Sequence, residues 1–318
     1  MKVSLITTVR NAGGRVEPFL RAISAQTRPP DEMIVVDGGS TDGTLETLRR
    51  AEAITLIEEP GANIARGRNV AVAASAHEVI AVSDADCEPE PEWLERLVAT
   101  LEEGADVAMG FYRPIARRFW QQVLACVNLP DAERIDPARF MPSSRSVAFR
   151  RGALEAAGGY PEWLDIGEDM YVDHRWRELG LDLRFVPQAV VRWPMRANLS
   201  ETWTQYLRYA RGDAIAGMHA DRHALRFAVY GGTLLAWSSR SRLPKAVTLV
   251  GATAYAAAPA RRVLRRFEGS AERARALAVL PAVMAFLDVA KIAGYVAGLI
   301  AGRRRSAPGD TAATVGTR

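Results

Sequence analysis

The first 111 residues alternate between short apolar runs and amphipathic stretches, and this alternation limits the fold more than any other feature of the sequence. Apolar strands are expected at residues 3–9, 32–37, 54–58, 79–83 and 107–111, with helical stretches between them. Strands separated by single helices form βα units, which build a mostly parallel sheet. Because the runs lack polar alternation, we expect helices to cover both faces of that sheet. The sequence therefore predicts an α/β fold for its N-terminal part.

Two of the expected strands end on aspartate, which brings acidic groups to one edge of the sheet. Ligands of an open α/β sheet bind beyond the carboxyl ends of its strands. Asp84 and Asp86 follow the fourth strand, and Mg²⁺ and Mn²⁺ prefer such oxygen ligands. Asp37 ends the second strand and is expected to bind a base or a ribose, whereas Asp42 is expected to be structural in the following turn. We therefore expect a ligand site with a divalent metal at this edge.

Two groups of basic and amide residues have both a binding and a structural interpretation. Arg66, Arg68 and Asn69 open a helix, where they would meet a nucleotide or form an exposed basic face. Gln205 and Arg208 share one face of a later helix, which would hold a sugar or a diphosphate, or else face a membrane. Spacing alone leaves both interpretations open.

An acidic pair, Glu168 and Asp169, begins a helix a few residues after the Gly158–Tyr160 turn. Attack by a hydroxyl group needs a general base, and a positioned aspartate can take that role. An aspartate at a helix start is also an ordinary N-terminal cap. The local pattern fits either role.

The last third of the chain changes character and predicts a membrane-associated helical region. Apolar stretches at 246–260 and 276–301 flank a basic segment, and only the second is long enough to span a bilayer. Asp288 and Lys291 lie three residues apart in that stretch and could pair. Basic residues between apolar stretches favour an anionic membrane surface over nucleic acid as a partner. A soluble helical subdomain is the alternative, and residues 306–318 are expected to form a disordered tail.

The ordered set of motifs resembles the family-2 glycosyltransferases of the GT-A fold, over roughly residues 1–215. The matching segments are residues 3–11, the run 32–44 that contains IVVDGGSTDGT, residues 63–69, the SDAD of 83–86, the SVAFRRGALEAAGGY of 146–160, and Glu168–Asp169. The resemblance implies a Rossmann-like, mostly parallel sheet in a catalytic domain of residues 1–215, followed by a helical, membrane-associated region of residues 216–305. It implies an enzyme that transfers a hexosyl-type sugar, with inversion, from a nucleotide-diphosphate donor. The acceptor would be a lipid-linked or cell-envelope glycan, on the cytoplasmic side of the cell membrane.

The resemblance also implies roles for individual residues. Asp169 would be the catalytic base, with Glu168 beside it near the acceptor. Asp86 would bind Mg²⁺ or Mn²⁺ together with Asp84, which would also contact the donor ribose. Further nucleotide contacts are expected from Thr8, Asp37, Arg66, Arg68 and Asn69. The donor sugar or its phosphates are expected to contact Ser143, Ser144, Arg145, Gln205 and Arg208.

Several other functions are disfavoured. Processive synthases of this family carry a Gln-x-x-Arg-Trp motif, whose last position is Tyr209 here, and the chain has too few apolar stretches for a polymer channel. A sugar-phosphate nucleotidylyltransferase would need an arginine-containing, glycine-rich loop after the first strand, which residues 8–14 match poorly. A non-catalytic membrane adaptor that retains the fold would not need its carboxylates, which are intact at Asp37, Asp84, Asp86 and Asp169. Residues 37–44 also lack the Gly-x-Gly-x-x-Gly spacing of nicotinamide dehydrogenases.

Overall fold

The computed structural model describes residues 1–305, with side chains as far as Gly302, so the predicted tail at 306–318 lies outside the described residues. Contacts between residues divide the chain into two compact units, Met1–Met195 and a second unit that begins at Arg196. The helix of Leu199–Ala216 therefore groups with the C-terminal helices, although a boundary at residue 215 would assign it to the catalytic domain.

The first unit contains one eight-stranded sheet of order β3-β2-β1-β4-β7-β6-β8-β5. Its strands are β1 (Val3–Val9), β2 (Glu32–Asp37), β3 (Thr55–Glu58), β4 (Val79–Val82), β5 (Glu88–Pro89), β6 (Val107–Ile115), β7 (Val147–Arg150) and β8 (Leu183–Pro194). Strands β1 to β4 pair in parallel, as predicted, whereas β7 runs antiparallel to both β4 and β6, so the sheet is mixed. Strand β8 is continuous and has a register irregularity opposite Met109–Phe111 of β6.

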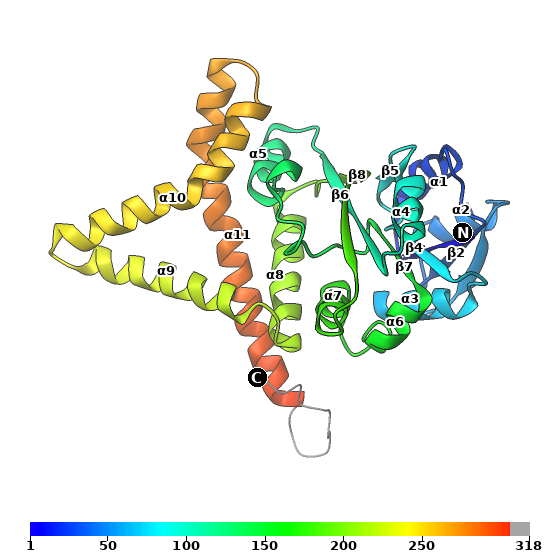
Figure 1. The fold of residues 1–318 in the computed structure, drawn as a ribbon. Coiled ribbons are helices and arrows are strands. Elements are labelled where there is room, and N and C mark those ends of the chain that lie inside the picture. The colour runs from blue at the N-terminus through cyan, green and yellow to red at the C-terminus, as the bar shows by residue number, and fades with distance from the viewer. Residues whose placement is uncertain (306–318) are drawn as a thin grey trace. The chain divides into compact units, whose positions relative to one another are not determined.

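Helices cover both faces of this sheet (Figure 1). They are α1 (Val16–Ser24), α2 (Thr44–Arg49), α3 (Ile64–Ala74), α4 (Trp93–Glu102), α5 (Phe119–Asn128), α6 (Arg151–Ala157) and α7 (Glu168–Glu178), with short 3₁₀ turns at Gly13–Arg15 and Ala132–Arg134. Leu5 and Ile6 are neighbours on β1, so they point to opposite faces, and both are fully buried. Ile6 packs in a core that includes Val72 of α3 and Trp176 of α7, whereas α4 packs on β6, β7 and β8. The apolar strands predicted this double coverage.

The strand register brings three loops to one edge of the sheet. Asp37 at the end of β2 is opposite Val9 of β1, and Val82 at the end of β4 is opposite Ile6. Because β7 is antiparallel to β4, its first residue, Val147, pairs with Val82. The segment that leads into β7 therefore approaches the same edge as the acidic turn after β4.

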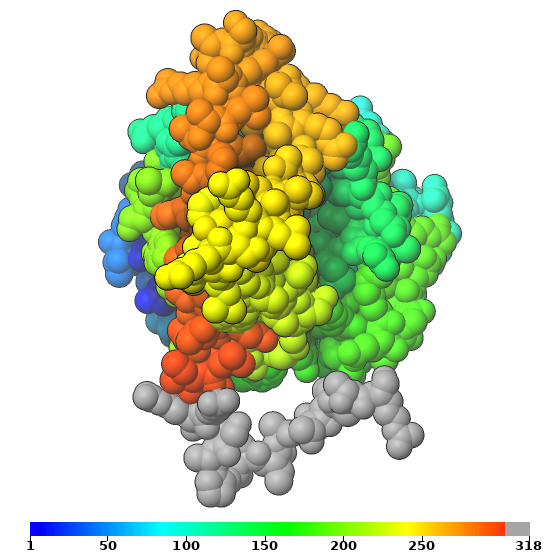
Figure 2. All heavy atoms as spheres, turned by 90° about the vertical axis from the view of Figure 1, so that its left-hand side faces the viewer, coloured from blue at the N-terminus to red at the C-terminus, as the bar shows by residue number. Residues whose placement is uncertain are grey.

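The second unit consists of four helices: α8 (Leu199–Ala216), α9 (Ala220–Ser238), α10 (Arg242–Arg266) and α11 (Ser270–Arg305). The N-terminal cap of α8 is Asn198, whose side chain accepts a hydrogen bond from the Glu201 backbone. Helix α11 packs along α8, while α9 and α10 form a hairpin that faces the viewer in Figure 2. Among the described residues, α11 contains the one candidate membrane span by length and hydropathy, Ser270–Gly302.

Candidate active site

Two carboxylates and a thiol meet in the turn that follows β4. The backbone N–H of Cys87 donates to the Asp84 carbonyl at 2.9 Å, and this tight turn brings ligand atoms of Asp84, Asp86 and Cys87 within 4.8 Å of one another. Cys87 is fully buried, and burial raises the pKa of its thiol well above the usual range. Mg²⁺ and Mn²⁺ prefer oxygen to sulfur ligands, so the two carboxylates are the candidate metal ligands. An oxygen donor set of this kind fits Mg²⁺ or Mn²⁺.

Arg68 connects this turn to the acidic pair of α7. Its side chain, only 4% exposed, places Nη2 at 3.1 Å from Oδ1 of Asp84, and Nη1 donates to Oε1 of Glu168, which is equally buried. The guanidinium also lies over the Tyr160 ring, 5.3 Å from its centroid. One buried cation thus holds together two carboxylates that are 84 residues apart in the chain. Arg68 therefore has a structural role, because it connects the turn after β4 to α7. Its contact with a nucleotide stays a prediction.

Arg145 reaches Asp84 from the segment before β7. Its Nε lies 3.5 Å from Oδ2 of Asp84, and its guanidinium stacks over Trp193 at 4.4 Å and Tyr112 at 5.4 Å. Both carboxylate oxygens of Asp84 therefore face arginines, whereas Asp86 has a weaker ion pair with the half-exposed Arg15 at 3.8 Å.

Asp37 is buried at the end of β2 and has two different carboxylate oxygens. Oδ2 accepts hydrogen bonds from the backbone N–H groups of Gly39 (2.9 Å) and Ser40 (2.8 Å), which shape the turn. Oδ1 has no hydrogen-bond partner among the described residues, although it is buried. A buried acceptor without a partner costs free energy, so this oxygen is a candidate contact for a ligand N–H or O–H. Asp42 bonds to the Thr44 backbone and hydroxyl, which is the structural role predicted for it.

Asp169 lies in the first turn of α7, which begins after Gly167 in a left-handed conformation (φ 85°). Its Oδ2 accepts hydrogen bonds from the Ser143 hydroxyl at 3.2 Å and the Ser144 backbone at 3.3 Å. Its Oδ1 accepts from the N–H of Met170 at 2.8 Å. The carboxylate is half-buried and oriented by a loop from elsewhere in the chain, so it does more than cap its own helix.

The neighbouring acids of α7 are buried more deeply. Burial raises the pKa of Glu168 to about 7, the Asp169 carboxylate adds to this rise, and the Arg68 guanidinium opposes it. Asp173 lies one helical turn after Asp169, is 2% exposed, and burial likewise raises its pKa. Sequence reasoning overlooked Asp173, although its spacing of four residues from Asp169 places both on one helical face.

Three other predicted nucleotide-binding residues have clear structural partners. Arg66 is half-exposed and pairs with Glu59 at 2.6 Å, so it lies on the exposed basic face. The Asn69 amide donates to the Tyr160 carbonyl and accepts from the Tyr160 N–H, both at 2.9 Å, and so holds the turn before α7. Thr8 on β1 packs against Gly67 of α3, and a Cβ at position 67 would lie 2.7 Å from the methyl group of Thr8. The glycine therefore lets α3 approach the sheet closely. Their contacts with a nucleotide stay predictions.

Gln205 and Arg208 belong to the second unit, on α8. Gln205 is buried and donates to the Tyr209 hydroxyl at 2.8 Å, while Arg208 is exposed. Their contact with a donor sugar stays a prediction.

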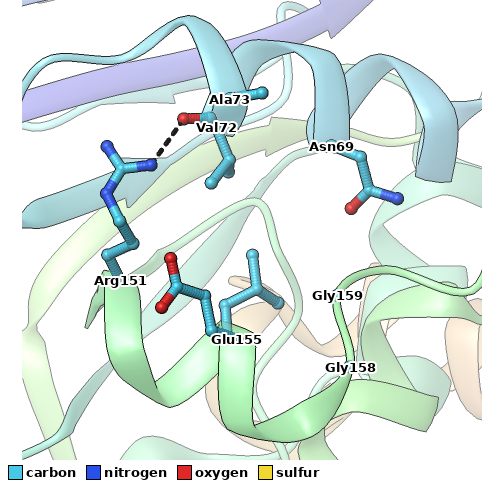
Figure 3. Close-up of a pocket in the computed structure, with 8 residues that line it drawn as sticks. Asn69, Val72, Ala73, Arg151, Glu155, Gly158 and Gly159 are labelled. Atoms are coloured by element: carbon cyan, nitrogen blue, oxygen red, sulfur yellow. Dashed lines mark hydrogen bonds between the residues drawn. The ribbon is translucent and has the colours of Figure 1, made fainter.

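A surface hollow between α3 and α6 is separate from the carboxylates described above (Figure 3). Arg151 lies in its wall and donates to the carbonyls of Val72 and Ser75 at 2.7 Å and of His77 at 2.9 Å. These bonds satisfy the last carbonyls of α3, so the arginine has a structural role there. None of the acidic residues predicted for the site lines this hollow.

The aromatic partners of Arg145 were also missed by sequence reasoning. Trp193 lies near the end of β8 and Tyr112 lies on β6, and the two strands pair in parallel. No local motif marks either residue, because their role depends on a register between distant strands.

The family model for glycosyl transferase family 2 matches residues 4–155. Glycosyltransferase AglE of Haloferax volcanii is 29% identical over 235 residues, which cover 70% of this chain and 76% of that protein. The O-antigen chain rhamnosyltransferase RfbN of Salmonella typhimurium is 27% identical over 221 residues, or 65% and 70% of the two chains.

Solved structures show the same fold. The mannosyltransferase PcManGT from Pyrobaculum calidifontis, in complex with GDP-Man and Mn²⁺, has a TM-score of 0.56 at 22% identity, over 94% of this chain and 87% of that chain. S. aureus TarS 1–349 in complex with UDP-GlcNAc has a TM-score of 0.54 at 18% identity, over 96% and 92% of the chains. With the family match over residues 4–155, the relatives and the carboxylate-lined sheet edge, these likenesses support a family-2 glycosyltransferase, an enzyme with the GT-A fold.

Proposed function

We propose that the protein transfers a hexosyl-type sugar from a nucleotide-diphosphate donor to a lipid-linked or cell-envelope glycan, with inversion at the anomeric carbon. The observation that carries this proposal is the chain of contacts from Asp84 through Arg68 to Glu168 and its neighbour Asp169. It connects the acidic turn after β4, where a donor diphosphate would bind, to a candidate general base. A sugar transfer needs both groups within one site.

Asp86 and Asp84 would hold a divalent cation, and Arg145 would add positive charge beside them. When bound, the metal would neutralise the diphosphate and stabilise the departing nucleoside diphosphate. The PcManGT structure was solved with GDP-Man and Mn²⁺, which supports a divalent cation as the cofactor. The unpartnered Oδ1 of Asp37 would accept a hydrogen bond from the nucleoside.

Asp169 would take the proton of the acceptor hydroxyl as that oxygen attacks the anomeric carbon. The hydrogen bonds from Ser143 and Ser144 fix the direction of this carboxylate and leave lone pairs for the acceptor proton. Direct displacement of the diphosphate by the activated oxygen inverts the configuration. Glu168, held by Arg68, would act as a positioning residue for Asp169.

The acceptor and the location are proposed from the relatives and the second unit. RfbN is an O-antigen chain rhamnosyltransferase, which supports a cell-envelope glycan as acceptor. The apolar helix Ser270–Gly302 and the basic C-terminal third support association with the cytoplasmic side of the cell membrane.

The proposal is tested by measuring thermal stability with UDP, GDP, dTDP and CDP, with and without Mn²⁺. A ligand that binds only the folded protein stabilises it by about 2.7 kcal/mol at a hundredfold excess over its dissociation constant. We expect one nucleotide to stabilise the protein only with metal, and Asp86→Ala to abolish that effect. No stabilisation by any of the four nucleotides would contradict the proposal.

A further inference from the structure

The exposed apolar side chains of the described chain gather on the α9–α10 hairpin. Twelve of the twenty large hydrophobic residues that are exposed lie on these two helices. Leu234 and Leu235 on α9 are 73% and 76% exposed, and Leu243 and Val250 on α10 are 73% and 71% exposed. An exposed apolar surface of this extent marks an interaction site.

The charges on the hairpin are almost all positive, with Asp221 at the start of α9 as the exception. No aspartate or glutamate occurs between Arg222 and Phe267, a segment that includes almost all of both helices. Nine basic residues occur there: Arg222, Arg226, Arg240, Arg242, Lys245, Arg261, Arg262, Arg265 and Arg266. Apolar surface combined with a strong excess of positive charge is complementary to an anionic lipid surface. A second copy of the chain would present the same positive charge to this face and repel it.

The tip of the hairpin has the composition of a membrane interface. Trp237 lies at the end of α9, and the ammonium of Lys245 lies over its ring, 5.9 Å from the centroid. Arg240 and Arg242 lie in and beside the connection between the helices, and both are exposed. Indole rings and long basic side chains favour the level of the lipid headgroups. Basic residues at the tip disfavour passage across the hydrocarbon core, so a shallow position along the surface is favoured.

Helix α11 is the apolar helix that hydropathy selects, but one side of it packs against the other helices of the second unit. Gly294 and Gly298 lie against the backbone of α8, and a Cβ at position 294 would come 2.1 Å from the Leu207 carbonyl oxygen. Leu280 and Leu287 are almost fully buried. Part of its apolar surface is therefore already used by packing within the second unit, and Val289, Val296, Leu299 and Ile300 stay exposed.

Asp288, in the middle of α11, also connects this helix to the rest of the second unit. Asp288 is 2% exposed and accepts hydrogen bonds at 3.0 Å from Arg226 and Tyr230 of α9 and from Tyr255 of α10. These hydrogen bonds come from α9 and α10, whereas the ammonium of Lys291, three residues further along α11, lies over the Tyr206 ring. If α11 crossed a bilayer in this arrangement, Arg226 would have to enter with it, at a considerable free-energy cost.

We infer that the α9–α10 hairpin, and not α11, is the membrane-binding element, and that it lies in the headgroup region of an anionic bilayer. This inference rests on the proposed function, because it names the element that would bring the enzyme to a lipid-linked acceptor. Hydropathy alone would instead select the apolar stretch of α11, residues 276–301, as the membrane-binding segment.

Flotation of the full chain with lipid vesicles tests this inference. The vesicles contain phosphatidylcholine alone or phosphatidylcholine with 30% phosphatidylglycerol. We expect the wild type to float with the anionic vesicles and at least tenfold less with the neutral ones. The double variant Leu234→Asp/Leu235→Asp should stay unbound, and Arg240→Gln/Arg242→Gln should bind the anionic vesicles roughly tenfold more weakly.

The matched control is Val296→Asp/Ile300→Asp, which places two charges on exposed positions of α11 (40% and 52%). It should float like the wild type. Release of this control together with continued flotation of Leu234→Asp/Leu235→Asp would overturn the inference in favour of a spanning α11. A wild-type dimer that becomes monomeric in Leu234→Asp/Leu235→Asp, with no flotation, would assign the face to a second copy.

Vesicle binding is measured without a donor, and nucleotide stabilisation is measured on the same samples without vesicles. Loss of flotation with intact nucleotide stabilisation would therefore refute the membrane element alone. Flotation without any nucleotide stabilisation would count against the proposed function and leave the membrane element in place.

Discussion

Arg68 is the residue whose replacement should disturb the first unit most sharply. Its guanidinium is 4% exposed and pairs with Glu168, which is also 4% exposed, and with Asp84. Replacement by Met preserves much of the side-chain volume but leaves the Glu168 carboxylate buried without a cation. Removal of one partner from a buried ion pair costs about 3–5 kcal/mol. For a domain of this size, that corresponds to a fall in the melting temperature of roughly 6–20 °C.

Circular dichroism of the full chain during heating measures this effect, and a double-mutant cycle isolates its cause. In Arg68→Met/Glu168→Gln the buried charge is gone together with its cation, so the combined loss should be at least ~1 kcal/mol smaller than the sum of the two single losses. Arg66→Met is the matched control, because Arg66 is on the same helix but half-exposed, and its ion pair with Glu59 faces solvent. Its melting temperature should stay close to that of the wild type. Strictly additive losses in the cycle, or an equal loss in Arg66→Met, would refute this reasoning.

Three further predictions concern the carboxylates. Asp86→Ala should abolish stabilisation by nucleotide with Mn²⁺, measured as a thermal shift, because one of the two candidate metal carboxylates of the acidic turn is removed; an unchanged shift would exclude Asp86 as a ligand. Asp169→Asn should keep that shift but lower the transfer rate by about 10²–10⁴, as for loss of a general base; normal turnover would remove the proposed mechanism. Glu168 has a folded-state pKa of about 7, above its ordinary 4.5. Its contribution to stability is therefore complete below about pH 4.5 and is lost as the pH rises through 7. Urea denaturation between pH 4.5 and 8 should show the wild type losing stability relative to Glu168→Gln as the pH rises, and parallel curves would contradict the burial argument.

The sequence by itself determined the α/β class and the position of two acidic groups on the sheet. The apolar runs that became β1, β2 and β4 need cover on both faces, and Asp37 and Asp84 follow directly from where these runs end. Such features depend on local periodicity and on the common direction of parallel strands. The ordered motifs also indicated the family and drew attention to Asp169.

The tertiary structure decided how these groups connect. Arg68 pairs with Glu168, one hundred residues away, because α3 and α7 share one core, and periodicity cannot show such a pairing. Ser143 reaches Asp169 because β7 runs antiparallel to β4 and brings its preceding segment to the acidic edge.

The C-terminal helices illustrate the same limit. Hydropathy ranks α11 as most suited to a membrane, but Gly294 against the α8 backbone and Asp288 among the polar groups of α9 and α10 pack one side of it inside the second unit. Hydropathy adds up the residues of one segment, whereas exposure depends on which neighbours cover that segment after folding. Only the packed structure therefore shows that the apolar surface left uncovered is largely that of α9 and α10.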